Sequence, residues 1–198
     1  MYWLGIDTSG VELCVCLLAD DVVQFRKTYG ERRQQGDVLF PLIDEALASA
    51  ALTLQDLAGL AVVTGPGSFT GLRLGLAAAQ GLARASALKV AGYDRFTLLR
   101  GALAGQPAAI VLDSLREELF VQLPDQAPAM LTASDIAAQW PGPVCGDGAG
   151  LIEGRPVLEV PDAAALAARQ MAKDVASGAA LPPLLPCYMR APDITSPA

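Results

Sequence analysis

The sequence predicts an α/β fold with one lobe built on a mixed β-sheet and a smaller, degenerate second lobe. Three apolar strand patterns follow one another directly at residues 2–6, 13–18 and 22–29. Strands then alternate with long helix-forming segments, which gives a β-β-β-α-β-α-β order. Beyond residue 104 the segments become shorter and richer in proline and glycine. We therefore expect an N-terminal lobe over residues 1–104 and a smaller C-terminal lobe over residues 105–198.

The individual elements are predicted from hydrophobic periodicity and from the turn and capping residues between the apolar segments. The first three strands predict an antiparallel meander at one edge of the sheet. Asp37 is a candidate N-cap for a helix to about residue 51, because apolar side chains after it recur with helical spacing. The lobe then continues with alternating strands and helices, expected at residues 57–63, 70–86, 89–92 and 93–104. The second half predicts two strands and a last helix, at residues 108–112, 119–123 and 162–176.

Composition and net charge exclude several functional classes. The chain has 198 residues, 53% hydrophobic and 18% charged, which is enough apolar material for a substantial core. No apolar run approaches the roughly 20 residues of a membrane span, and no basic leader opens the chain, so a cytoplasmic protein is expected. The net charge of −7 argues against broad nucleic-acid binding. The lack of histidine removes Ser-His and Cys-His nucleophile pairs and common zinc sites, so no catalytic residue and no metal ligand is predicted.

A glycine-rich turn joins the buried strand at residues 57–63 to the following helix. Gly65, Gly67 and Ser68 place backbone N–H groups beside a helix N-terminus, a geometry suited to phosphate. The turn is not a Walker A loop, because no Lys-Ser/Thr pair follows it. Glycines that only make a tight turn and close helix packing explain the pattern equally well. Both interpretations stay open at this point.

The first strand closes in the polar turn formed by Asp7, Thr8 and Ser9. Asp7 is a candidate ligand for magnesium-bound water, or a residue that only bonds the backbone of its own turn. The candidate nucleotide or phosphate contacts are therefore drawn from this turn and the glycine loop, namely Asp7, Thr8, Ser9, Gly65, Gly67 and Ser68.

The helix expected at residues 70–86 is apolar nearly all round, so it must be covered on more than one side. Gly71, Gly75 and Ala79 lie four residues apart and let another backbone approach. Packing within the chain and contact with a second chain are both possible. On the second hypothesis, a bulky residue at position 75 abolishes pairing but leaves the monomer folded. The interface would then comprise Val38, Leu42, Glu45, Leu72, Arg73, Gly75, Leu76 and Gln80.

Several motifs resemble, in order and spacing, those of the bacterial TsaB (YeaZ) family, which carries an older glycoprotease (M22) label. They are Gly5-Ile6-Asp7-Thr8-Ser9, Pro41-Leu42-Ile43, the block from Gly65 to Arg73, and Ala79-Gln80-Gly81-Leu82-Ala83. Weaker similarity at Asp113 to Phe120, Gly146-Asp147-Gly148 and Tyr188-Met189-Arg190 extends the resemblance over nearly the whole chain. The order of elements is also similar to one lobe of the actin/Hsp70/sugar-kinase (ASKHA) superfamily. In that fold the glycine turns surround ATP and an acidic residue ending the first strand helps hold magnesium.

The resemblance implies a non-catalytic accessory subunit in the synthesis of tRNA threonylcarbamoyladenosine. Such proteins pair with a larger catalytic relative, TsaD, which transfers the threonylcarbamoyl group, and a small ATPase, TsaE, joins the assembly. A homodimer is implied when TsaD is absent, and tRNA contact is at most indirect. No cofactor is required, and ATP or ADP at the heterodimer junction is left open. The metal-binding histidine pair of TsaD has no counterpart at residues 93–97.

The chain departs from the family pattern in two motifs, and its second lobe is short. Gln35-Gly36-Asp37 stands where the family often has a His-Ser pair, and Ser114, Leu115 and Glu117 break a later motif. These departures argue against productive nucleotide binding by this chain alone. Two further functions stay open. One is a small phosphotransferase with its own ATP turnover and Asp113 as the base. The other is a stand-alone homodimeric scaffold with an unrelated partner.

Overall fold

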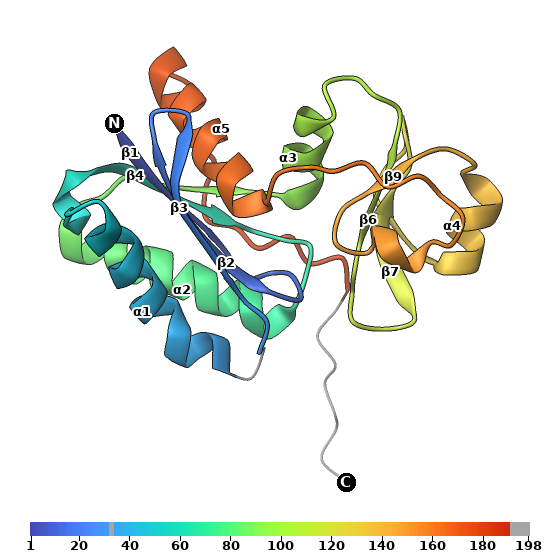
Figure 1. The fold of residues 1–198 in the computed structure, drawn as a ribbon, viewed down its shortest axis with the longest axis horizontal. Coiled ribbons are helices and arrows are strands. Elements are labelled where there is room, and N and C mark those ends of the chain that lie inside the picture. The colour runs from blue at the N-terminus through green and yellow to red at the C-terminus, as the bar shows by residue number, and fades with distance from the viewer. Residues whose placement is uncertain (32–33, 191–198) are drawn as a thin grey trace, which may run out of the picture.

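The computed structural model describes residues 1–31 and 34–190, and in these residues the chain forms two mixed β-sheets (Figure 1). The first sheet has the strand order β3-β2-β1-β4-β5. Strands β1 to β3 are an antiparallel meander at one edge, as predicted, and β1, β4 and β5 are parallel. The five strands are β1 (Tyr2–Asp7), β2 (Leu13–Ala19), β3 (Val22–Tyr29), β4 (Leu57–Val63) and β5 (Val90–Tyr93).

Helices cover both faces of this sheet (Figure 1). Because side chains alternate along a strand, Leu4 and Leu60 join the core under one pair of helices, while Trp3 joins the core on the opposite face. The first pair is α1 (Gln35–Ser49) and α2 (Phe69–Ser86), and the second is α3 (Arg95–Ala102) and α5 (Ala163–Ser177). None of the described helices is both long enough and apolar enough to cross a membrane.

Helix α1 begins earlier than its sequence suggests. Gln34 occupies the N-cap position without a side-chain hydrogen bond, and Gln35, the first helical residue, is buried. Asp37 therefore lies in the first turn and is not the N-cap, so that prediction was wrong. The carboxylate still suits this position, because it faces the positive end of the helix dipole.

The second sheet has the order β8-β7-β6-β9. Strands β6 and β7 agree with the predicted pair, but the other elements were not predicted. Their patterns are too short to stand out in the sequence, and each depends on pairing or packing with β6 and β7. The elements are β6 (Ala109–Leu112), β7 (Glu118–Gln122), β8 (Ala129–Thr132), α4 (Ala133–Gln139) and β9 (Val144–Cys145).

The C-terminal segment returns to the first sheet. Helix α5 lies directly over β1, where a Cβ atom at Gly5 would overlap the carbonyl oxygen of Ala164. Beyond α5 the chain runs along the far edge of the sheet, where the N–H of Gly92 donates to Pro182 O at 3.2 Å and that of Cys187 to Thr64 O at 2.7 Å. The division at residues 104 and 105 stays a prediction, and the last part of the chain contributes to the first core.

Candidate functional site

The glycine loop and the polar turn after β1 are packed against each other. The hydroxyl of Thr8 donates to the carbonyl oxygen of Gly71 at 2.6 Å, and the N–H of Ser68 donates to Ser9 O at 2.8 Å. A Cβ atom at Gly67 or Gly71 would overlap the carbonyl oxygens of Ser9 and Thr8, respectively. The glycines are therefore required for close approach of two backbones of the same chain.

Asp7 bonds its own turn. Its Oδ1 accepts the N–H of Ser9 at 2.8 Å and the hydroxyl of Ser9 at 2.5 Å, and the residue is only 6% exposed. This is the geometry of an Asx turn, in which the carboxylate substitutes for backbone partners. One carboxylate oxygen of Asp7 is thus engaged within the chain.

Two backbone N–H groups at the glycine loop, those of Ser68 and Gly71, have partners within the chain. The N–H of Ser68 donates to Ser9, as described above. The N–H of Gly71 donates to the hydroxyl oxygen of Ser68 at 3.3 Å, and this bond caps α2. The carbonyl oxygen of Gly65 accepts the N–H of Arg95 at 2.6 Å, which ties α3 to the loop. These bonds favour the tight-turn interpretation of the loop. Phosphate or nucleotide contact by the six candidate residues stays a prediction.

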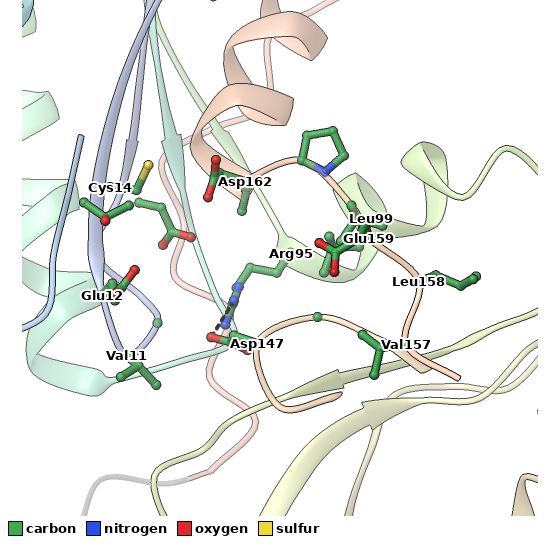
Figure 2. A pocket seen from close by; sticks show the side chains of 17 residues that line it. Val11, Glu12, Cys14, Arg95, Leu99, Asp147, Val157, Leu158, Glu159 and Asp162 are labelled. Atoms are coloured by element: carbon green, nitrogen blue, oxygen red, sulfur yellow. Dashed lines mark ion pairs between the residues drawn. The ribbon is translucent and has the colours of Figure 1, made fainter. Parts of the chain in front are cut away.

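A cavity of about 510 Å³ opens next to this turn, between the two sheets (Figure 2). Asp7 and Gly10 line it from the first sheet, and Asp147 lines it from the turn after β9. The guanidinium of Arg95 projects between them and forms an ion pair with Asp147, with Nη2 at 2.9 Å from Oδ2. Arg95 is only 5% exposed, so the cavity contains a nearly buried cation.

Sequence reasoning missed Arg95. In the sequence, residues 93–97 stand out only for lacking the metal-binding histidines of TsaD. The available signal was an arginine in the first helical turn directly after a buried strand. At that end the helix dipole is unfavourable for a cation, so a carboxylate partner elsewhere is to be expected.

Cys14 lines the same cavity, and its reactivity gives a test of the fold. Burial raises the pKa of Cys14 far above its usual value, and raises those of Cys16 and Cys145 to about 11. A thiol reacts through its thiolate, so these three should be inert in the native protein at about pH 8. We expect a colorimetric thiol reagent to modify only the half-buried Cys187 before unfolding, and all four cysteines in guanidinium chloride. Fast native labelling of the other three would contradict this packing.

Half of the predicted interface residues lie inside the chain. Leu42, Leu72, Gly75 and Leu76 are buried. A Cβ atom at Gly75 would lie 2.5 Å from the Thr8 hydroxyl oxygen, so α2 uses its small residues to approach the β1 turn. A bulky residue at position 75 would therefore disturb the monomer, contrary to our expectation. The interface itself stays a prediction. Its accessible residues are Val38, Glu45, Arg73 and Gln80.

The exposed residues of α1 and α2 form a surface on one side of the first sheet, called here the α1–α2 surface. Phe40 of α1 is 46% exposed and was not among the predicted interface residues. Beside α2 lies an open hollow of about 490 Å³ that contains Ala77, Gln80 and Gly81. The surface comprises the partly exposed Val38 and the exposed Asp37, Phe40, Asp44, Glu45, Arg73, Ala77, Gln80, Gly81 and Arg84.

Two charged residues of this surface already have partners within the chain. Glu45 pairs with Lys27 of β3 at 2.8 Å. The guanidinium of Arg73 lies 3.9 Å from the ring centre of Phe69, and that ring packs against Tyr188 with centroids 5.1 Å apart. Arg73 is thus held by stacking, and its charge stays at the surface.

The topology defines the class of protein. A five-stranded mixed sheet with helices on both faces, followed by a second mixed sheet, is the ASKHA/RNase H-like α/β arrangement. A crystal structure from Pseudomonas aeruginosa, described as an uncharacterized protein with similarity to peptidase YEAZ, superposes with a TM-score of 0.73. It is 25% identical and covers 96% of this chain and 99% of that one.

Sequence comparison shows which family within this fold class the chain belongs to. A family model described as TsaD: tRNA N6-adenosine threonylcarbamoyltransferase matches residues 32–135. The Mycobacterium tuberculosis protein Rv3421c, described as uncharacterized, is 31% identical over 96% of this chain and 92% of its own length. The tRNA threonylcarbamoyladenosine biosynthesis protein TsaB of Escherichia coli is 34% identical over 57% of this chain and 48% of its own length. The chain belongs to the TsaB/YeaZ family, which confirms the resemblance inferred from its motifs.

Proposed function

We propose that this protein is a non-catalytic accessory subunit of a tRNA threonylcarbamoyladenosine synthesis complex in the cytoplasm. It stabilises and orients a TsaD-like catalytic subunit, and a TsaE-like ATPase joins the same assembly. The observation that carries the proposal is the α1–α2 surface, which combines the exposed Phe40 with a hollow lined by small residues of α2. An exposed aromatic side chain and a surface hollow are each typical of protein interfaces.

The charges of this surface support pairing with a related subunit. The exposed charges of α1 are all acidic, at Asp37, Asp44 and Glu45, whereas those of α2 are basic, at Arg73 and Arg84. Under a two-fold or pseudo-two-fold axis, the acidic helix of one subunit can face the basic helix of the other. A catalytic subunit built on the same fold would satisfy this condition with an acidic and a basic helix at the corresponding places. A second copy of this chain does so as well, and we propose that it occupies the surface when the partner is absent.

The phosphotransferase alternative has less support. Its candidate base, Asp113, already accepts the N–H of Leu115 on Oδ1 at 2.6 Å. The glycine loop that would hold the phosphates is packed against the β1 turn. We therefore assign no cofactor to this chain alone, and keep ATP or ADP at the junction with the partner as part of the proposal. The net charge of −7 supports an indirect role toward tRNA.

Light scattering after size exclusion tests the proposal. The chain is measured alone and mixed with the TsaD-like protein of its own organism, with and without ATP, ADP and the TsaE-like protein. We expect a dimer of the chain alone that is replaced by a 1:1 complex on mixing. Failure to form a complex under all of these conditions would contradict the accessory role. A dimer that persists unchanged would then favour the stand-alone scaffold, and ATP turnover would favour the phosphotransferase.

A further inference from the structure

The cavity between the two sheets has a wall with three chemically different parts. It lies on the side of the first sheet that α3 and α5 cover, so it is separate from the α1–α2 surface. We propose that this cavity binds a free α-amino acid with an aliphatic side chain. Arg95 holds the carboxylate of this ligand, acidic residues of the wall attract its ammonium group, and aliphatic residues pack against its side chain.

Arg95 supplies the part of the wall that binds an anionic group. The residue is only 5% exposed and lines the cavity (Figure 2). Its Nη2 pairs with Asp147 at 2.9 Å, but Nε and Nη1 have no hydrogen-bond partner within the described residues. Buried polar groups in proteins nearly always have a partner, so these two donors call for an acceptor. A carboxylate is well suited to guanidinium N–H groups. Because neither atom is open to water, the guanidinium must turn toward the cavity when the ligand binds.

Acidic residues form the second part of the wall. Five carboxylates line the cavity, those of Asp7, Glu12, Asp147, Glu159 and Asp162. Asp147 and Asp162 have arginine partners. Among the described residues, neither Glu12 nor Glu159 has an ion-pair partner, and both are exposed. A dianion such as free phosphate is repelled by this excess of negative charge, whereas a ligand with an ammonium group beside its carboxylate matches both charges of the wall.

The third part of the wall is aliphatic. Leu99 of α3 and the segment before α5, with Leu158 and Val160, contribute to it. Leu99 is buried, and the other two side chains are partly buried against the same core cluster. The volume of about 510 Å³ lies in the range of small-molecule sites, so a side chain the size of leucine has room beside the two charged groups. Contact with the aliphatic wall then removes apolar surface from water.

A titration of the full wild-type chain, followed by nuclear magnetic resonance, tests this inference. The ligands are L-leucine and two analogues that each lack one charged group, namely 4-methylpentanoate without the ammonium and 3-methylbutylamine without the carboxylate. We expect L-leucine to shift the Nε–H signal of Arg95 and to bind once per chain. Each analogue should bind at least about tenfold more weakly, because one of the two charged contacts is lost.

Variants separate the two charged parts of the wall. Arg95→Met should weaken L-leucine by at least about tenfold, whereas Arg84→Met, which removes an exposed arginine of α2, should leave its affinity unchanged. The double variant Glu12→Gln and Glu159→Gln should weaken L-leucine but strengthen 4-methylpentanoate. A purely structural role of these residues would not produce opposite changes for the two ligands.

Three results would overturn the inference. The first is the absence of any shift near the solubility limit of L-leucine. The second is inorganic phosphate that binds more tightly than L-leucine, since the site would then be a plain anion site. The third is an analogue that binds as tightly as L-leucine. These measurements use the wild-type chain, so they decide the question even if Arg95→Met does not fold. None of them includes a TsaD-like protein, and their outcome is therefore independent of the proposed accessory role.

Discussion

Replacing Gly71 with alanine is expected to destabilise the protein by at least about 3 kcal/mol, more than most single substitutions do. The added methyl group would overlap the carbonyl oxygen of Thr8, and neither backbone can move freely. Gly71 is held by the Thr8 hydroxyl, and Thr8 lies in the turn that ends the central strand β1. The measurement is the free energy of unfolding from urea denaturation, followed by circular dichroism.

Gly81→Ala is the matched control for this prediction, because both glycines lie in α2. A Cβ atom at Gly81 meets nothing within 4 Å. Since glycine disfavours a helix interior, this substitution should stabilise the protein by roughly 0.5–1 kcal/mol. A Gly71→Ala variant that unfolds at the same urea concentration as the wild type would show that the loop does not pack on the β1 turn.

Ala77→Arg is expected to abolish the proposed complex with the TsaD-like subunit while leaving the monomer folded. Ala77 is exposed and lines the hollow beside α2, so the new side chain has room in the free chain. In the proposed complex the bulky side chain would fill the hollow beside α2 that the partner is expected to enter. We expect a loss of about 3 kcal/mol or more, roughly 100-fold in Kd, measured by titration calorimetry.

Ala176→Arg provides the control for the second prediction. Ala176 is also exposed and helical, but it lies on α5, which covers the opposite face of the first sheet. The same substitution there should leave affinity unchanged and report any general effect of added charge. Equal affinities for the two variants would place the interface elsewhere on the molecule, even if the accessory role itself is correct.

The larger elements of the first lobe could be predicted because their patterns are local. Strands β1 to β4 and helix α2 have apolar periodicity over six or more residues, bounded by glycine, proline or aspartate. The start of α1 was misplaced, because burial of Gln35 extends the helix beyond a plausible cap at Asp37. Elements such as β9, which has two residues, exist only through pairing with a neighbour and leave no pattern of their own.

The candidate site was predicted only in part, for a related reason. The sequence identified Asp7 and the glycine loop, but it left open whether the glycines meet a phosphate, a partner or the chain itself. The fold brings Thr8 and Ser9 onto the loop and thus places the close approach inside the monomer. Arg95 and Asp147 are 52 residues apart in the numbering, so their ion pair is a product of the two-sheet arrangement.

By itself, the sequence determined the α/β class, the order of the first-lobe elements and the family. The reason is that the hydrophobic periodicity of strands and helices, and the glycine motif, can each be recognised within a short segment of the chain. Tertiary structure decided which face of α2 is buried, that α5 returns to the first sheet, and that Arg95 pairs with Asp147. These features depend on contacts between distant segments. Such contacts are selected by the burial of apolar area and the pairing of charges, and neither can be read from one segment alone.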